Sequence, residues 1–174
     1  MAYTAPVLSD TPLEGVDLTY TQQPYTTTSG DPAYPALPFN YGTRILTSNN
    51  GSATYVLAAA TINQYDFVSI TSTGSAQPLT AALATTAKYI GCATFTAIAN
   101  GYAGWVATQG TVTGNVLLSC AADVALYATG TAGYLDDAAS PTTVLKLNGI
   151  VAVSARGTTN GSTSLVMTYP VQAE

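Results

Sequence analysis

Histidine is absent from this 174-residue chain, and cysteine occurs only at Cys92 and Cys120. Without an imidazole, the chain has neither the usual general base nor a Ser-His-Asp arrangement, and a cysteine nucleophile has no imidazole to activate it. Two cysteines far apart in the sequence do not form a zinc cluster by themselves. We interpret both as reduced, buried thiols; a disulfide between them is the alternative, and it requires that their strands be neighbours.

Charged residues are also scarce, at 7% of the chain against about 25% in an average globular protein. The few basic residues lie singly along the chain, at Arg44, Lys88, Lys146 and Arg156. Nucleic acids and anionic membrane surfaces both require clustered basic groups, so we expect neither as a partner. Because no run of about 18 apolar residues exists and the first residues lack the pattern of a signal peptide, we also expect no membrane span and no leader.

Carboxylates are the remaining acid–base groups, but their spacing does not indicate catalysis. A glycosidase needs two carboxylates that face each other across a cleft. The adjacent pair Asp136 and Asp137 is interpreted as part of a loop, with a weak calcium site as the alternative. No phosphate-binding loop, dinucleotide fingerprint or paired CxxC motif is present. We therefore predict no catalytic, cofactor-binding or metal-binding residues, and a protein that is not an enzyme.

Proline and aromatic residues, in contrast, concentrate near the start of the chain. Six of the nine prolines lie between Pro6 and Pro38, which excludes a helix over most of this stretch and disfavours a central strand. Disordered segments are usually poor in aromatic residues, yet six occur within residues 1–41. We predict that residues 1–43 form a long extended N-terminal arm whose aromatic side chains bind a partner; an idle tail is the alternative. These side chains are Tyr3, Tyr20, Tyr25, Tyr34, Phe39 and Tyr41.

Residues 44–174 show the pattern of a β-rich body. Short runs rich in Val, Ile, Thr and Tyr are separated by Gly, Asn, Asp or Pro, and the Asn-Gly pairs are typical of hairpin turns. We predict an all-β fold, with this body forming a compact antiparallel β-barrel or β-sandwich and one weak helix at 79–88. The predicted strands are 53–59, 67–71, 90–97, 104–108, 115–120, 125–127, 144–147, 150–155 and 164–169.

Trp105 is the only tryptophan, and it begins one of the predicted strands. Tryptophan is favoured both in cores and at interfaces, so we interpret Trp105 as a core or subunit-interface residue. A platform for stacking sugars is the alternative.

Five segments of the body follow one another in a recognisable order: Tyr65–Ile70, Ile90–Ala93 before Asn100-Gly101, Gly104–Gly110, Asp123–Tyr127 leading to Gly130 and Gly133–Leu135, and Ile150–Val153. This succession, over about residues 60 to 155, resembles the small decoration (cement) proteins of tailed-bacteriophage capsids. The resemblance implies a β-barrel or β-sandwich body that is a homotrimer, seated on the outer surface of a capsid, with an extended arm over the coat subunits.

We therefore expect a non-enzymatic virion protein, made in the host cytoplasm, whose partner is the major capsid (coat) protein. A body and an arm provide two linked contacts, so the second forms at a high effective concentration and holds neighbouring coat subunits together. The alternatives are another assembly component, such as a phage tail or fibre protein or a surface-layer or pilus-like subunit, and a carbohydrate-binding β-module or glycan-active enzyme.

Overall fold

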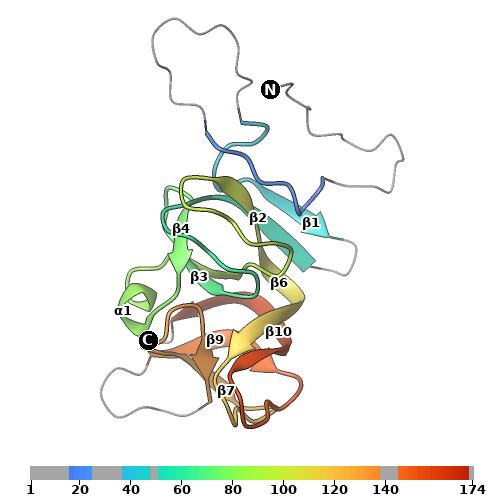
Figure 1. Ribbon diagram of the computed structural model, residues 1–174, viewed down its shortest axis with the longest axis vertical. Coiled ribbons are helices and arrows are strands. Elements are labelled where there is room, and N and C mark those ends of the chain that lie inside the picture. The colour runs from blue at the N-terminus through green and yellow to red at the C-terminus, as the bar shows by residue number, and fades with distance from the viewer. Residues whose placement is uncertain (1–15, 25–36, 48–50, 138–144, 173–174) are drawn as a thin grey trace, which may run out of the picture.

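The computed structural model describes residues 16–24, 37–47, 51–137 and 145–172. Strands account for 49% of the residues and helix for 3%, which confirms the predicted all-β class. Five of the strands close a barrel, which favours the barrel over the sandwich. In Figure 1 the N-terminal segments, β1 and β2 lie at one end of the body, and β7, β9 and β10 lie at the other.

The closed barrel lies at the end of the body nearer the N-terminal segments. Its strands, in order around the ring, are β2 (Gly51–Ala58), β4 (Ser75–Pro78), β3 (Phe67–Ile70), β5 (Tyr89–Cys92) and β6 (Ala103–Val116). Neighbours are antiparallel except β2 and β4, which pair in parallel through Leu57 with Ser75. An additional strand, β1 (Arg44–Thr47), pairs with β2 outside the ring.

The long strand β6 continues beyond this barrel into the second half of the body. There it pairs with β10 (Gly161–Gln172), and the sheet continues through β9 (Leu145–Ala152), β7 (Ala125–Ala128) and β8 (Leu135–Asp136). The strand β8 returns to β6 through Val116 and Leu135, so these pairings also form a closed circuit. Strand β6 therefore takes part in both circuits.

Side-chain alternation along β2 and β6 places apolar residues on both sides of the barrel wall. Val56 and Val106 belong to the cluster inside the barrel, whereas their neighbours Tyr55 and Trp105 belong to a separate cluster on its outer face. Because both faces are covered, every residue of β2 except Leu57 is buried. A third cluster spans both halves of the body, because it joins Phe67 on the barrel strand β3 to Leu126 on β7 and Leu165 on β10.

Two breaks between predicted strands lie inside single strands, so the separation of 104–108 from 115–120 and that of 144–147 from 150–155 are wrong. The strand β6 runs through Thr113-Gly114-Asn115. The glycine is needed here because a Cβ at position 114 would lie 2.6 Å from Cζ of Phe67 and leave no room for that ring. The strand β9 likewise runs through Asn148-Gly149. Gly149 has a φ of +81°, and the register between β9 and β10 shifts nearby, so this glycine serves a bulge instead of a turn.

The remaining elements agree with the predictions to different degrees. The strands predicted at 53–59, 67–71, 125–127 and 164–169 correspond to β2, β3, β7 and β10, and β9 and β10 pair antiparallel. The strand predicted at 90–97 ends early, at Cys92. The predicted helix shortens to α1 (Ala81–Ala84), which begins after Thr80, whose hydroxyl accepts a hydrogen bond from the N–H of Leu83.

Three strands were not predicted. Two of them, β1 and β8, are too short to show a clear alternation, and β4 ends at Pro78, a residue that disfavours strands. Asp136 lies in β8, so the loop interpretation of the Asp136–Asp137 pair is wrong for the first of the two residues.

Candidate docking surface

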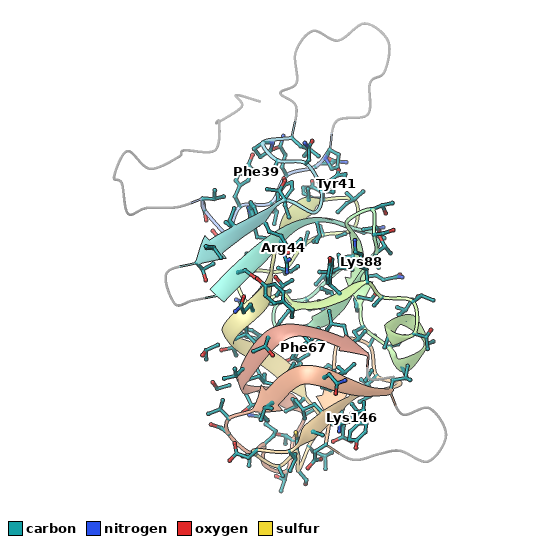
Figure 2. The ribbon with its side chains drawn as sticks, turned by 180° about the vertical axis from the view of Figure 1, so that it is seen from behind. Phe39, Tyr41, Arg44, Phe67, Lys88 and Lys146 are labelled. Atoms are coloured by element: carbon teal, nitrogen blue, oxygen red, sulfur yellow. The ribbon has the colours of Figure 1, made fainter. Side chains whose placement is uncertain are left out.

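The described N-terminal segments, residues 16–24 and 37–43, pack against the outer face of the barrel. The ring of Phe39 lies edge-on to Tyr55 and Trp105, with centroids 5.5 Å and 5.0 Å away, and Tyr41 stacks on Tyr55 at 6.3 Å. Figure 2 places Phe39 and Tyr41 together at this end of the body. Val16, Leu18 and Leu37 complete the cover, so that Trp105 is only 1% exposed.

Backbone hydrogen bonds attach both N-terminal segments to the barrel. The N–H of Gln22 donates to the carbonyl of Ala103 at 2.9 Å, and the N–H of Ala103 donates back to the carbonyl of Gln22 at 2.6 Å. The N–H of Gly42 donates to the carbonyl of Tyr55 at 2.8 Å, and Tyr55 donates to Thr43 at the same distance. The two segments thus extend the hydrogen bonding of β6 and β2.

The predicted partner-binding aromatic residues fall into two groups. Tyr3, Tyr25 and Tyr34 lie outside the described residues. Tyr20 is half-buried beside Gln22, and Phe39 and Tyr41 are half-buried against the body's own Tyr55. The binding of a partner by these side chains stays a prediction. Trp105 is a core residue, and its burial excludes the stacking platform that was the alternative.

The second half of the body presents a sheet face that the described N-terminal segments leave uncovered. One row of side chains crosses four strands, from Thr111 on β6 to Val166 on β10, Val151 on β9 and Ala125 on β7. Register and hydrogen bonding add the flanking positions, and we call the whole set the open face: Gln109, Thr111, Thr113, Ala125, Val151, Val153, Ser164, Val166 and Thr168.

The open face is apolar at its centre and carries no charge. Val151, Val153 and Val166 are 40%, 49% and 41% exposed, and their neighbours on the face are mainly threonine and serine. Depletion of charged residues with exposed apolar side chains at the centre is the composition of a protein–protein interface. An antiparallel sheet turned only to water has a polar outer side.

Sequence reasoning did not single out the valines of the open face, although a signal existed. In β9, Ile150 and Ala152 are buried, while Val151 between them and Val153 after the strand are exposed. A half-buried strand should alternate apolar with polar residues, so apolar residues at both sets of positions indicate that both faces are to be covered.

Asp66 forms a buried polar network near the junction of the two halves. One carboxylate oxygen accepts from the backbone N–H of Asn63 at 2.9 Å and from its side-chain amide at 3.2 Å. The other accepts from the side-chain amide of Asn115 at 3.1 Å. Three donors satisfy a carboxylate that is only 3% exposed, so Asp66 has a structural role in joining β6 to the turn before β3.

Both cysteines are buried and free, so they form no disulfide. Burial raises the pKa of the Cys92 thiol, and the negative charge of Asp66 adds to the effect. Burial, followed by the charges of Asp137 and Asp136, raises the pKa of Cys120 to about 11. Neither thiol is therefore a thiolate near neutral pH, and neither has the activation that a cysteine nucleophile needs.

The acidic residues near Cys120 do not form a metal cage. Asp137 accepts a hydrogen bond from the N–H of Ala121 at 2.8 Å, which ties this carboxylate to the neighbouring loop. Across residues 16–24, 37–47, 51–137 and 145–172 there is no group of three or more His, Cys, Asp or Glu that could hold a metal ion. Within the same ranges, no helix has the length and apolarity needed to cross a bilayer.

No protein-family model matches this chain, and no curated protein is significantly similar to it.

Proposed function

We propose that this protein is a non-enzymatic structural component of a virus particle: a decoration protein that binds the outer surface of a phage capsid as a homotrimer and stabilises the contacts between coat subunits. The observation that carries the proposal is the open face, in particular the exposed valines Val151, Val153 and Val166, which share this face with neutral residues. The resemblance over residues 60–155 supplies the kind of assembly in which this face works.

Electrostatics favours docking through such a face. The chain has a formal net charge of −5, so two copies repel each other on average. A contact made through the open face brings no charge into the interface, and therefore no ion has to lose its water without a partner. The valines supply the apolar area, and the hydroxyl groups of Thr111, Thr113 and Thr168 supply hydrogen bonds at the rim.

The N-terminal sequence supplies a second, linked contact. Residues 16–24 are attached to the body by backbone hydrogen bonds and apolar contacts, so the sequence that the proposal leaves for the second contact precedes Val16. Any stretch of 15 residues can span at most about 50 Å, a length that would reach an adjacent subunit. The second contact then forms at a high effective concentration once the open face is docked.

A binding experiment with phage particles tests this function. Particles from a phage that lacks this gene are mixed with the purified protein, and bound protein is quantified after sedimentation. The variants Val151→Lys and Val166→Lys each place a charge at the centre of the open face, whereas Leu118→Lys alters a 53% exposed residue that is not part of it. We expect at least a tenfold loss of binding for the first two and wild-type binding for the third.

Two results would contradict the proposal. One is undiminished particle binding by both valine variants. The other is that mass spectrometry of purified phage finds the protein in isolated tails or fibres and not in heads, which would favour the tail alternative. Sedimentation equilibrium of the free protein tests the homotrimer separately, because a monomer at all concentrations would remove that part.

A further inference from the structure

A small hollow lies where β6 passes from the barrel into the second half of the body. It has a volume of about 190 Å³, and it adjoins the open face because Gln109 and Thr111 belong to both. At this point β2 begins, at Gly51, and β10 starts to pair with β6 through Thr168 and Gln109. The register between β2 and β6 shifts at the same place, which opens the space between the strands.

The walls of the hollow come from five parts of the chain: the N-terminal segment, β1, the start of β2, the loop between β5 and β6, and β6. Leu18 of the N-terminal segment forms one side, and Phe95, from the loop between β5 and β6, forms another. Thr47 at the end of β1 and Thr94 beside Phe95 contribute hydroxyl groups. The hollow therefore combines an aromatic ring, an aliphatic side chain and several neutral hydrogen-bonding groups.

None of the described residues that line the hollow is charged. A phosphate or a carboxylate that entered it would lose water without gaining an ionic partner, and the net charge of −5 on the chain would repel it. A cation would meet no carboxylate. The chemistry of the walls therefore selects a neutral ligand.

Several polar groups in the hollow have unused hydrogen-bonding capacity. The side-chain amide of Gln109 and the hydroxyl of Thr111 make no hydrogen bond with any described residue. The hydroxyl of Thr94 accepts from the N–H of Thr113 at 3.1 Å and keeps its own proton to donate. An amide provides two donors and an acceptor, and each hydroxyl provides both functions, so this set matches a ligand with several adjacent hydroxyl groups.

We propose that the hollow binds one neutral sugar residue. The C–H face of a pyranose ring packs on Phe95 and Leu18, and its hydroxyl groups bond to Gln109, Thr111 and Thr94. The volume of about 190 Å³ is below the roughly 300–1,000 Å³ of pockets for drug-sized ligands, so the site takes a single ring, either free or at the end of a glycan. Gln109 and Thr111 also belong to the open face, so the sugar is expected to bind the isolated protein, in which this face is uncovered, and the test does not require the capsid.

Saturation-transfer NMR on the full-length protein tests the proposal. The probes are the methyl glycosides of glucose, galactose, mannose and N-acetylglucosamine, each at up to 20 mM (about the range needed for a millimolar dissociation constant). We expect saturation to pass from the protein to the C–H protons of at least one probe. The transfer should be largest when the aromatic protons of the protein are irradiated, because Phe95 is proposed to pack against the sugar ring.

Matched variants locate the binding. Thr111→Val removes the hydroxyl and keeps the shape, whereas Thr113→Val makes the same change two residues along β6 at a position that does not line the hollow. Likewise, Gln109→Ala changes the lining, and Gln77→Ala on β4 does not. We expect binding to weaken roughly threefold to tenfold in Thr111→Val and Gln109→Ala, the loss of one hydrogen bond each, and to stay unchanged in both controls.

Each outcome decides the matter. Absence of transfer to all four probes overturns the proposal, as does transfer that is equal in Gln109→Ala and in the wild type. Circular dichroism and the thermal midpoint of every variant show whether the fold is retained. A variant that is unfolded is replaced by Gln109→Leu, which keeps roughly the same volume and removes the amide, so it should weaken binding in the same way.

Discussion

The ring of Phe39 lies edge-on to the indole of Trp105, with the ring centroids 5.0 Å apart and an interplanar angle of 66°. This contact joins a segment that comes before the first strand to the middle of the barrel wall. It makes the N-terminal segment part of the hydrophobic structure of the body, because Tyr55 and Trp105 would otherwise face water.

Replacement of Phe39 by alanine should destabilise the protein and hydrate Trp105. Phe39 is half-buried and contacts two aromatic rings, so we expect the free energy of unfolding to fall by about 1.5–3 kcal/mol. Urea titration measures this loss. Because Trp105 is the only tryptophan, its emission should also shift to longer wavelength in the native state.

Leu46→Ala is the matched control for Phe39→Ala. Leu46 is 85% exposed on β1, so its truncation should change the free energy of unfolding by less than about 0.5 kcal/mol and leave the emission of Trp105 unchanged. Equal losses in the two variants would show that the contact of Phe39 with the barrel has no energetic weight.

Composition predicted correctly that residues 16–24 and 37–43 are not helical, but it did not reveal what Phe39 and Tyr41 pack against. Prolines and aromatic residues indicate an extended chain that must cover an apolar surface. Whether that surface belongs to a partner or to the same chain depends on where Tyr55 and Trp105 point, which alternation in β2 and β6 decides only once the barrel is closed. The sequence therefore predicted the chemistry of the contact without its location.

Gly133→Ala should destabilise the protein far more than Gly101→Ala. Both glycines have positive φ, +79° and +77°, so both variants incur a backbone strain of about 1 kcal/mol. A Cβ at Gly133 would also lie 2.5 Å from Cγ of Asp66, whereas nothing lies within 4 Å of one at Gly101. We expect a difference of at least about 2 kcal/mol between the two variants in chemical denaturation. Similar losses would mean that the surroundings of Asp66 adapt freely.

The glycines also explain why some strands were predicted wrongly. A glycine next to asparagine or threonine indicates a turn, but the same residue is needed where two parts of a fold approach closely or where a strand bulges. Gly114 makes room for Phe67, and Gly149 permits a bulge. These causes are tertiary, so the local pattern cannot separate them from Gly74 and Gly101, which do lie in turns.

Stability should fall as the pH rises above about 8.5. Burial raises the pKa of Cys120 to about 11 and also raises that of Cys92, while both thiols titrate near 8.5 in the unfolded chain. Above that pH the unfolded state releases protons that the folded state retains, so the free energy of unfolding decreases until the folded thiols ionise. Urea titrations at pH 7, 8, 9 and 10 measure this slope.

The double variant Cys92→Ala, Cys120→Ala identifies the thiols as the cause. It should lose most of the decline between pH 8 and 10, whatever its stability at pH 7. Burial raises the pKa of Tyr41 above its usual 10, so this phenol acts only at still higher pH. An equally steep decline in the double variant would assign the effect to other groups.

Arg44→Met should weaken the attachment of β1 to the rest of the body. The guanidinium carbon of Arg44 lies 4.1 Å from the ring centroid of Tyr169 on β10 and 5.3 Å from that of Tyr89 on β5, although β1 itself pairs only with β2 among the described strands. Methionine keeps an unbranched stem and removes the cation, so we expect the free energy of unfolding, measured by urea titration, to fall by about 1–2 kcal/mol.

The control is Lys146→Met on β9, a cation with no such ring contact among the described residues, and its effect should stay below about 0.5 kcal/mol. A double-mutant cycle with Tyr169→Leu should give a coupling energy of at least about 0.5 kcal/mol, because each single variant loses the interaction of the pair, whereas the double variant loses it only once. A coupling energy near zero would show that Arg44 passes over these rings without binding them.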